Sequence, residues 1–161
     1  MSQCLCIHNR KIGPGQPVFI VAEMSANHGQ DFDQAVKIIR AAKEAGADAV
    51  KLQTYTPDTI TINCDNDCFV IKDTIWAGKS LYQLYGEACT PWEWQPKLQQ
   101  VAHSLGLEFF STPFDASAVD FLEDMDVRVH KVASFELVDL PLLKKIGSTG
   151  KPVILSTGMA T

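Results

Sequence analysis

Two lysines and two carboxylates stand at or near the ends of short apolar runs in this chain. Glu23 ends the run VFIVAE, Lys51 lies in DAVKLQTY, and Lys131 lies in VRVHKVAS, five residues before Glu136. A buried lysine without a partner loses its charge or destabilises the fold, so two buried lysines at one place need anionic partners. Ammonium groups with hydroxyl donors beside them suit phosphate and carboxylate together. The sequence therefore predicts a site for a small substrate that carries both kinds of anion.

Two alternative interpretations of these lysines stay open. Lys51 and Lys131 can instead pair with Glu23 and Glu136 as structural ion pairs. Another alternative is a barrel enzyme that forms a Schiff base at Lys131. The serines and threonines that frame both lysines favour anion binding over a Schiff base. Since the charged residues recur at successive strand ends, we favour a functional site over isolated structural pairs.

Further polar residues extend this candidate site. Gln53 and Tyr55 share one side of their strand with Lys51, although either residue can also simply fill the interior of a barrel. His28 follows the first strand end, and we expect it near the site. Trp76 lies in a long loop and is the best placed of the three tryptophans to contact a substrate. The remaining candidates at strand ends are Thr112, Phe114, Ser134 and Ser156, whereas His8, His103 and His130 are expected to be structural or superficial.

The elements that must position these residues alternate between strand and helix along the chain. Strands are expected over 18–23, 48–55, 107–114, 127–134 and 152–157, and helices over 31–45, 90–105, 115–123 and 139–146. Asp31, Asp115 and Asp139 are expected to cap helices, and Thr90 with Glu93 reads as a capping box with Pro91 at the first helical position. Residues 4–12 suggest a small hairpin. Residues 56–89 suggest an ordered loop with a short helix near 80–86.

Repeated strand–helix units predict an α/β fold with a parallel sheet. No G-x-G-x-x-G turn follows the first strand, which argues against a dinucleotide-binding fold. The favoured fold is a TIM-type (β/α)8 barrel that is incomplete, with about five strands in one domain over residues 1–161. Because such a part has open sheet edges and an unfilled interior, we expect it to be poorly stable alone or to pair with something.

Composition excludes several classes of protein. Apolar residues make up 46% and charged residues 20% of the 161 residues, which is typical of a globular domain, and no apolar run is long enough for a membrane helix. A net charge of −5 argues against nucleic acid as a partner. The start of the chain does not resemble an export signal, and five cysteines then indicate reduced thiols in the cytoplasm. Cys64 and Cys68 flank two aspartates, but their spacing is not typical of zinc, so free thiols are favoured.

Five blocks of sequence resemble the sialic acid synthase family in order and spacing. They are AEMSANH (22–28), GADAVKLQTY (46–55), FFSTPFD (109–115), KVASFE (131–136) and KPVILSTGMAT (151–161). The stretches 56–67 and 76–94 look most like the pseudaminic acid synthase branch. The resemblance implies condensation of phosphoenolpyruvate with 2,4-diacetamido-2,4,6-trideoxy-altrose to give pseudaminic acid and phosphate. N-acetylneuraminate or legionaminate synthesis is the alternative within the family, and an inactive binding or assembly module is the alternative outside it.

The resemblance also implies roles for single residues. Glu23 and Glu136 would be the acid–base carboxylates, Gln53 would face the amino sugar, and Phe114 would wall the enolpyruvate pocket. Lys51, Ser134 and Ser156 would hold the phosphate, and Thr112 and Lys131 would meet the carboxylate.

Other implied features lie outside this sequence. Members of the family use a divalent metal (Mn, Mg or Co) held by histidines beyond Thr161, so no metal ligand is expected in this chain. The last barrel strands and an antifreeze-like domain are likewise absent, and the full-length protein is expected to be a homodimer. We therefore expect the chain to be inactive alone.

Overall fold

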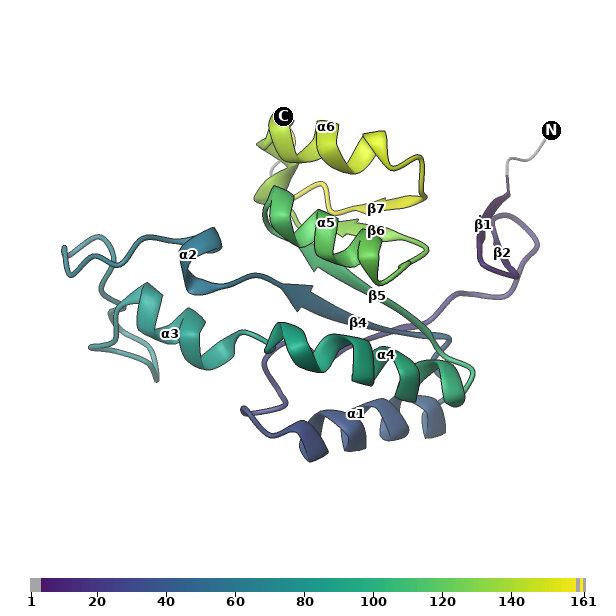
Figure 1. The fold of residues 1–161 in the computed structure, drawn as a ribbon, viewed down its shortest axis with the longest axis horizontal. Helices are drawn as coiled ribbons and strands as arrows, with labels where there is room; N and C mark the ends of the chain where they lie inside the picture. Colours follow the sequence, from purple (N-terminus) through teal and green to yellow (C-terminus); the bar gives the residue numbers. More distant parts are fainter. Residues whose placement is uncertain (1–3, 159, 161) are drawn as a thin grey trace.

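The computed structural model describes residues 4–158 and 160, which form a curled parallel sheet with helices on its outer face (Figure 1). The described strands of this sheet lie in the order β3-β4-β5-β6-β7, so neighbours in sequence are neighbours in space. This sequential order is that of a (β/α) barrel, whereas a doubly wound sheet reverses its strand order at a switch point. The predicted α/β barrel-type fold is therefore confirmed.

The bounds of the elements follow the predicted alternation. The strands are β1 (Leu5–Ile7), β2 (Arg10–Ile12), β3 (Val21–Glu23), β4 (Ala49–Thr54), β5 (Glu108–Pro113), β6 (His130–Val132) and β7 (Val153–Leu155). The helices are α1 (Phe32–Glu44), α2 (Pro57–Ile60), α3 (Leu81–Ala88), α4 (Gln95–Ser104), α5 (Ala116–Asp124) and α6 (Leu140–Ser148), with 3₁₀ turns η1 (Trp92–Trp94) and η2 (Glu136–Val138).

The outer face of the sheet carries the larger part of the hydrophobic core. Val50 and Leu52 of β4 pack with Phe109 of β5 against Ile39 of α1 and Leu98 of α4, and all five side chains are fully buried. These residues alternate along their strands with residues of the other face, as the period of two requires. None of the described helices combines the length and the apolar character needed to cross a membrane.

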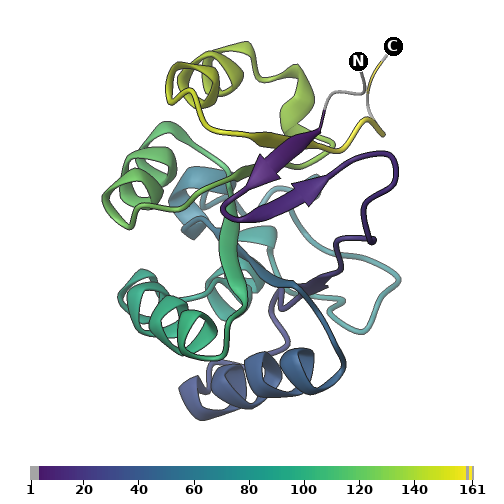
Figure 2. The ribbon, with the colours of Figure 1, turned by 90° about the vertical axis from the view of Figure 1, so that its right-hand side faces the viewer.

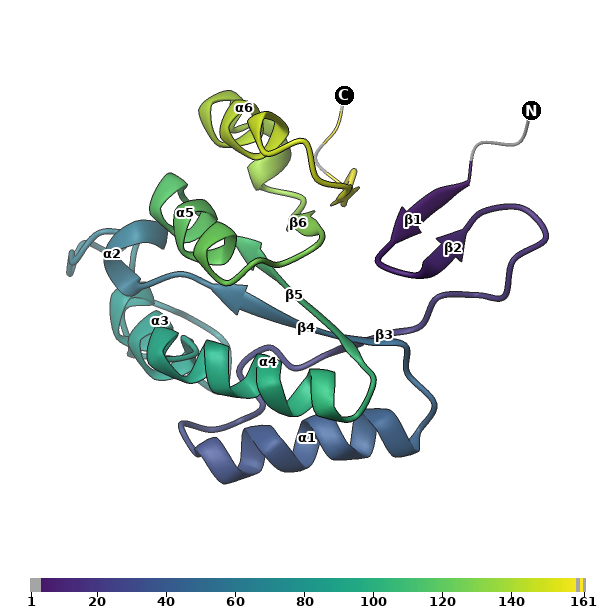
Figure 3. The same cartoon turned by 45° about the vertical axis from the view of Figure 1, so that its right-hand side comes forward.

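The N-terminal hairpin lies across the N-terminal ends of the strands and covers that end of the curled sheet (Figures 2 and 3). β1 and β2 pair in antiparallel fashion, with Leu5 opposite Ile12, which confirms the predicted hairpin. Ile7 is buried with Ala49, Phe110 and Val129 in a second apolar cluster. The hairpin therefore supplies apolar surface that covers these residues at the N-terminal end of the interior.

All five strands of the parallel sheet are shorter than predicted, and β3, β6 and β7 most of all. The first and last begin three residues and one residue late, at Val21 and Val153, and β6 contains only His130–Val132 of the predicted 127–134. A single residue pair, Ser111 with His130, joins β5 to β6. The apolar runs are longer than the ladders because β-branched residues also suit extended segments that lack regular cross-strand pairing.

The predicted capping box at Thr90 is wrong, whereas the predicted caps at Asp31, Asp115 and Asp139 are confirmed. The Thr90 hydroxyl instead lies 3.1 Å from Nε2 of His28, across 62 positions of the sequence. The chain then makes the η1 turn, whose Trp92 indole donates to the Tyr55 carbonyl oxygen at 3.1 Å, and α4 begins only at Gln95. A tertiary hydrogen bond has taken the hydroxyl that the local pattern assigned to the helix.

His28 is a packing residue rather than an open site residue. Its ring is fully buried, its Nδ1 accepts from the Gln30 amide at 3.1 Å, and its edge meets Trp94 in a T-shaped contact with 5.8 Å between ring centroids. Burial lowers the pKa of His28 below its ordinary value of 6.5. Both ring nitrogens thus have partners within the fold, and the ring joins the β3–α1 loop to the start of α4. That His28 lies near the site stays a prediction.

The long loop is ordered, as predicted, and is closed by its own backbone hydrogen bonds. Residues 70 and 80 form a bridge, and the Ile71 amide donates to the Lys79 carbonyl oxygen at 2.9 Å. Ser80 caps α3, and its hydroxyl accepts from the Gln83 amide. The loop therefore presents a fixed surface beside the C-terminal ends of β3 and β4.

Removal of the α5 cap is expected to lower stability. Asp115 accepts from the Ser117 amide at 2.9 Å and from the Ala118 amide at 3.1 Å. We expect Asp115→Ala to lower the free energy of unfolding by about 1 kcal/mol in urea denaturation followed by circular dichroism. Asp124→Ala, at the exposed C-terminal end of the same helix, is the matched control and should have no destabilising effect. Equal losses in the two variants would contradict the capping role.

Stability is also expected to fall as the pH falls below about 6.5. The unfolded chain takes up a proton at His28 in this range, whereas the folded chain, with its lowered His28 pKa, does not. The contribution is therefore fully present above the unfolded pKa and declines towards the folded one, by up to about 1.4 kcal/mol per pH unit. His28→Gln should reduce this slope in denaturation midpoints measured at several pH values, whereas the exposed His103→Gln should preserve it. An unchanged slope in His28→Gln would contradict the assignment.

Candidate active site

The concave face of the sheet changes from apolar to polar at one level along the strands. Val21, Ala49, Phe110, Val129 and Ile154 belong to the apolar cluster beneath the hairpin. Two residues further along the chain from each of them stand Glu23, Lys51, Thr112, Lys131 and Ser156. Because side chains alternate with a period of two, these polar groups share the face of the apolar row and lie nearer the C-terminal ends. This is the end of a (β/α) barrel where active sites are found.

Glu23 and Lys51 form an ion pair across neighbouring strands. They are directly opposite in the parallel register of β3 and β4, and Lys51 Nζ contacts Glu23 Oε2. The other carboxylate oxygen accepts from the Ser25 amide and from the Ser25 hydroxyl, each at 3.1 Å. Ser25 adopts φ 47°, a left-handed conformation that is uncommon for residues other than glycine. The carboxylate is thus held by a local turn on one side and by a lysine on the other.

Lys131 lies in the same cluster but has no carboxylate within ion-pair distance among the described residues. Its ammonium donates to the Ser156 hydroxyl at 2.6 Å and to the Val132 carbonyl oxygen at 2.5 Å. Burial lowers the pKa of Lys131, and the nearby charge of Lys51 lowers it further, while Glu23 and Glu136 act in the opposite direction. The four predicted charged residues are therefore close enough to influence one another.

Glu136 contributes a carboxylate oxygen that lacks a partner. It begins η2, four positions after the end of β6, and its Oε2 is buried with no hydrogen bond to any described residue. A buried polar atom of this kind commonly meets a proton, a water molecule or a ligand. The structural interpretation of the lysines thus holds for Lys51 with Glu23, whereas Lys131 and Glu136 do not form the corresponding pair.

Neighbouring strand ends bring the smaller polar residues to the same place. Gln53 lies opposite Thr112 in the register of β4 and β5, and Thr112 is 2% exposed. Ser134 follows β6, and a Cβ atom added to Gly158 would lie only 3.3 Å from the Ser134 Cβ. Glycine at 158 therefore lets the segment after β7 approach Ser134, which places the predicted phosphate-binding serines on adjacent strand ends.

Tyr55 and Phe114 form an aromatic wall, and Tyr55 is too enclosed for open contact with a substrate. The two rings meet edge to face with 5.4 Å between centroids, and Tyr85 of α3 meets Tyr55 in the same manner at 5.7 Å. Tyr55 is 4% exposed, and burial raises the pKa of its hydroxyl. Phe114 keeps partial exposure beside the polar cluster, whereas Tyr55 supports it from behind.

Sequence reasoning missed a hydrogen-bond network beneath these strand ends. The Thr54 hydroxyl donates to Gln95 Oε1 at 2.9 Å and lies 2.7 Å from the Ser111 hydroxyl, and all three residues are fully buried. The network fixes α4 against the strands that carry Gln53 and Thr112. Polar residues at positions that face the helix layer were the available signal, although only the tertiary structure brings Gln95 to them.

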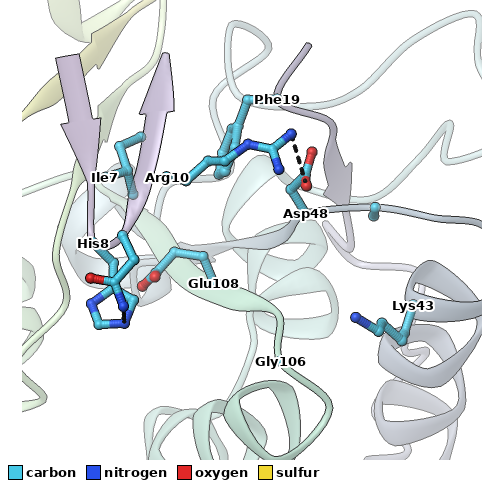
Figure 4. A pocket seen from close by; sticks show the side chains of 10 residues that line it. Ile7, His8, Arg10, Phe19, Lys43, Asp48, Gly106 and Glu108 are labelled. Atoms are coloured by element: carbon cyan, nitrogen blue, oxygen red, sulfur yellow. Dashed lines mark hydrogen bonds and ion pairs between the residues drawn. The ribbon is translucent and has the colours of Figure 1, made fainter. Parts of the chain in front are cut away.

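A separate cavity lies at the opposite end of the sheet, beneath the hairpin (Figure 4). Its volume is about 290 Å³, and its lining includes Ile7, Phe19 and Lys43. An ion pair of 3.4 Å joins Arg10 and Asp48 across it. Since the N-terminal end of a barrel serves stability rather than catalysis, we do not include this cavity in the candidate active site.

The chain resembles proteins named for the synthesis of nine-carbon sugar acids. It is 50% identical to a pseudaminic acid synthase of Helicobacter pylori over 91% of its own length and 43% of the relative's length. It is 36% identical to an N,N'-diacetyllegionaminic acid synthase of Legionella pneumophila, over 94% of the chain and 44% of the relative. The chain therefore spans less than half the length of these curated relatives.

A solved structure shares the same fold. It is the N-acetylneuraminic acid synthetase of Leptospira borgpetersenii in complex with citrate, with a TM-score of 0.83 and 31% sequence identity. The match covers the whole of this chain and 52% of that one. Residues 38–161, which include every predicted catalytic and substrate-binding residue except Glu23, match the pattern of one family. The chain belongs to the NeuB family.

Proposed function

We propose that the protein to which this chain belongs condenses phosphoenolpyruvate with 2,4-diacetamido-2,4,6-trideoxy-altrose, giving pseudaminic acid and phosphate. The observation that carries the proposal is the pair of lysines on one concave face, each with its own polar partner and with carboxylates on either side. Such a cluster suits a substrate with two anionic groups and a reaction that releases phosphate.

The two lysines would hold the two anionic ends of phosphoenolpyruvate. Lys131 and Ser156 are already joined by a hydrogen bond, so one group of the substrate can accept from both. Lys51 would turn from Glu23 towards the phosphate, with Ser134 at the neighbouring strand end. In the partly buried site, a bound anion would offset the charge of Lys131, which has no ion-pair partner among the described residues.

The carboxylates would transfer a proton and stabilise the developing positive charge. Carbon 3 of phosphoenolpyruvate attacks the aldehyde of the open-chain sugar, and positive charge develops at carbon 2, where water adds. Loss of phosphate then breaks the bond between carbon 2 and oxygen. Glu136 has an unpartnered, buried oxygen with which to stabilise that charge and guide the water, and Glu23 is held in place by Ser25 for proton transfer.

The choice of sugar rests on the relatives. Identity is 50% to the protein named for pseudaminic acid and 36% to the one named for diacetyllegionaminic acid. Both names point to N-acetylated amino sugars. We therefore place the pseudaminic acid precursor first and keep the legionaminic and N-acetylneuraminic precursors as alternatives.

A divalent metal would polarise the sugar aldehyde in the complete protein. Among residues 4–158, no three histidine, cysteine or acidic side chains come together as metal ligands, and Cys64 and Cys68 are free thiols. The described residues therefore do not form such a site by themselves. We propose that the metal ligands lie elsewhere in the complete protein.

Loss of either lysine is expected to weaken phosphoenolpyruvate binding. Each removes a charge-assisted hydrogen bond, so Lys51→Ala and Lys131→Ala should raise the dissociation constant by about tenfold or more in isothermal titration calorimetry of the complete protein. Lys144→Ala removes the same charge from an exposed position on α6 and should leave the constant unchanged. Unchanged affinity in both site variants, together with lower stability of Lys51→Ala, would support the structural ion pair instead.

Turnover is expected to need both substrates and Glu136. Phosphate should appear only when phosphoenolpyruvate and the diacetamido sugar are present together, with a divalent metal. Glu136→Gln should lower kcat by about a hundredfold or more, while phosphoenolpyruvate still binds, because the amide cannot stabilise positive charge. Glu44→Gln, exposed on α1, is the control. Full activity of Glu136→Gln would exclude the proposed role, and absence of phosphate release with every N-acetylated sugar would exclude the proposed function.

A further inference from the structure

A second cavity lies beside the candidate active site and is used by none of the steps above. It has a volume of about 280 Å³ and is formed by the β3–α1 loop, the long loop and the last turns of α3. Its lining residues are Ala26, Asn27, Trp76, Leu84, Glu87 and Ala88. Trp76 is 45% exposed, which is unusual for a side chain of this size.

The walls of this cavity are fixed to one another. The Gln30 side chain donates to the carbonyl oxygens of Glu87 at 2.9 Å and Cys89 at 2.6 Å, which ties the β3–α1 loop to the end of α3. The Trp76 amide donates to the Thr74 hydroxyl at 3.2 Å within a closed turn. The indole is thus held out by an ordered backbone, so a ligand would meet a formed surface with little ordering to do.

The chemistry of the lining suits a neutral ligand with both apolar and amide groups. Leu84, Ala26 and Ala88 offer apolar surface beside the indole. Glu87 is a charged residue in this lining, and its carboxylate pairs with Lys79. Among the described residues, the lining includes no lysine, arginine or histidine, so it offers no cation to a phosphate. Asn27 uses its side-chain N–H on the Met24 carbonyl oxygen at 2.9 Å, which leaves its side-chain oxygen free to accept. A free acceptor, an indole donor and methyl-sized apolar walls match acetamido groups.

The lining of the cavity includes residues close in sequence to a proposed catalytic carboxylate. Ala26 follows Glu23 by three positions, so their Cα atoms are at most about 11 Å apart. Ser25, which holds the Glu23 carboxylate, directly precedes the cavity lining. A neutral substrate in this cavity would therefore lie close to Glu23, the carboxylate that pairs with Lys51.

We propose that Trp76 and Asn27 form the subsite for the N-acetylated, deoxygenated end of the amino sugar, and that the indole selects for that end. This inference rests on the proposed function, which supplies the sugar. Trp76 would stack on the apolar edge of the sugar, and Asn27 would accept from an acetamido N–H. If the sugar carried a hydroxymethyl group at the same place, its hydroxyl would give up a hydrogen bond to water on binding. Leu84 and Ala88 would offer no hydrogen bond in return.

Trp76→Ala in the complete protein tests the subsite through two separate measurements. We expect the KM for 2,4-diacetamido-2,4,6-trideoxy-altrose to rise about tenfold or more, with the calorimetric affinity for phosphoenolpyruvate unchanged. The preference for this sugar over N-acetylmannosamine, expressed as the ratio of kcat/KM values, should fall by a similar factor. Trp76→Phe should keep most of the preference because it retains an aromatic face, and Ile75→Ala, at a residue 90% exposed, should change neither quantity.

The outcomes separate the subsite from the proposed function. Turnover by the unmodified protein with an unaltered sugar KM in Trp76→Ala would overturn the subsite alone. Equal loss of sugar and phosphoenolpyruvate affinity would also overturn it, since that result indicates a purely structural role for the loop. If the unmodified protein shows no turnover, sugar binding followed by saturation-transfer NMR decides: binding lost in Trp76→Ala and kept in Trp76→Phe supports the subsite without the reaction, and no binding by the unmodified protein overturns it.

Discussion

The rest of the site depends on how two ammonium groups share one concave face. Burial lowers the pKa of Lys131, and the nearby charge of Lys51 lowers it further, so the charged form of Lys131 carries a cost. The two lysines have different partners. Lys51 has Glu23 as an ion-pair partner, whereas Lys131 has a serine hydroxyl and a carbonyl oxygen and is left with a lowered pKa. The asymmetry leaves one lysine with an ion-pair partner and the other without one, which suits the proposed binding of an anionic substrate.

Strand geometry provides the position for these groups. The period of two along a strand places an apolar residue two positions before each polar one, so one face is dry near the hairpin and charged near the C-terminal ends. The opposite face of the same strands packs on the helices through Val50, Leu52 and Phe109. Each strand therefore contributes to two hydrophobic clusters and to the site at once, and the rigidity of packed elements is passed to the charged side chains.

Hydrogen bonds between segments distant in sequence fix the strand ends in place. His28 and Thr90 join the β3–α1 loop to the segment before α4, and Thr54 joins β4 to Gln95 and Ser111. These contacts lie behind the strand ends and are fully buried, where unpaired polar groups would be costly. They hold the segments that carry Glu23, Gln53 and Thr112 in fixed relation. The long loop is held by its own backbone hydrogen bonds and, at the end of α3, by the Gln30 side chain.

The sequence by itself determined the alternation of strands and helices, the hairpin, the aspartate caps and the residues that share the concave face, because these depend on local periodicity and local hydrogen bonds. It also indicated an anion site, since a lysine buried within an apolar run is destabilising unless a partner offsets its charge. Only the tertiary structure decided which partner each group has. Thr90 fits a capping box by spacing, yet a buried histidine 62 positions away takes its hydroxyl. His28 and Tyr55 follow strand ends but turn into packed interiors, and Lys131 bonds to Ser156 rather than to Glu136. Such choices depend on distances between segments that are remote in sequence, and no local pattern encodes them.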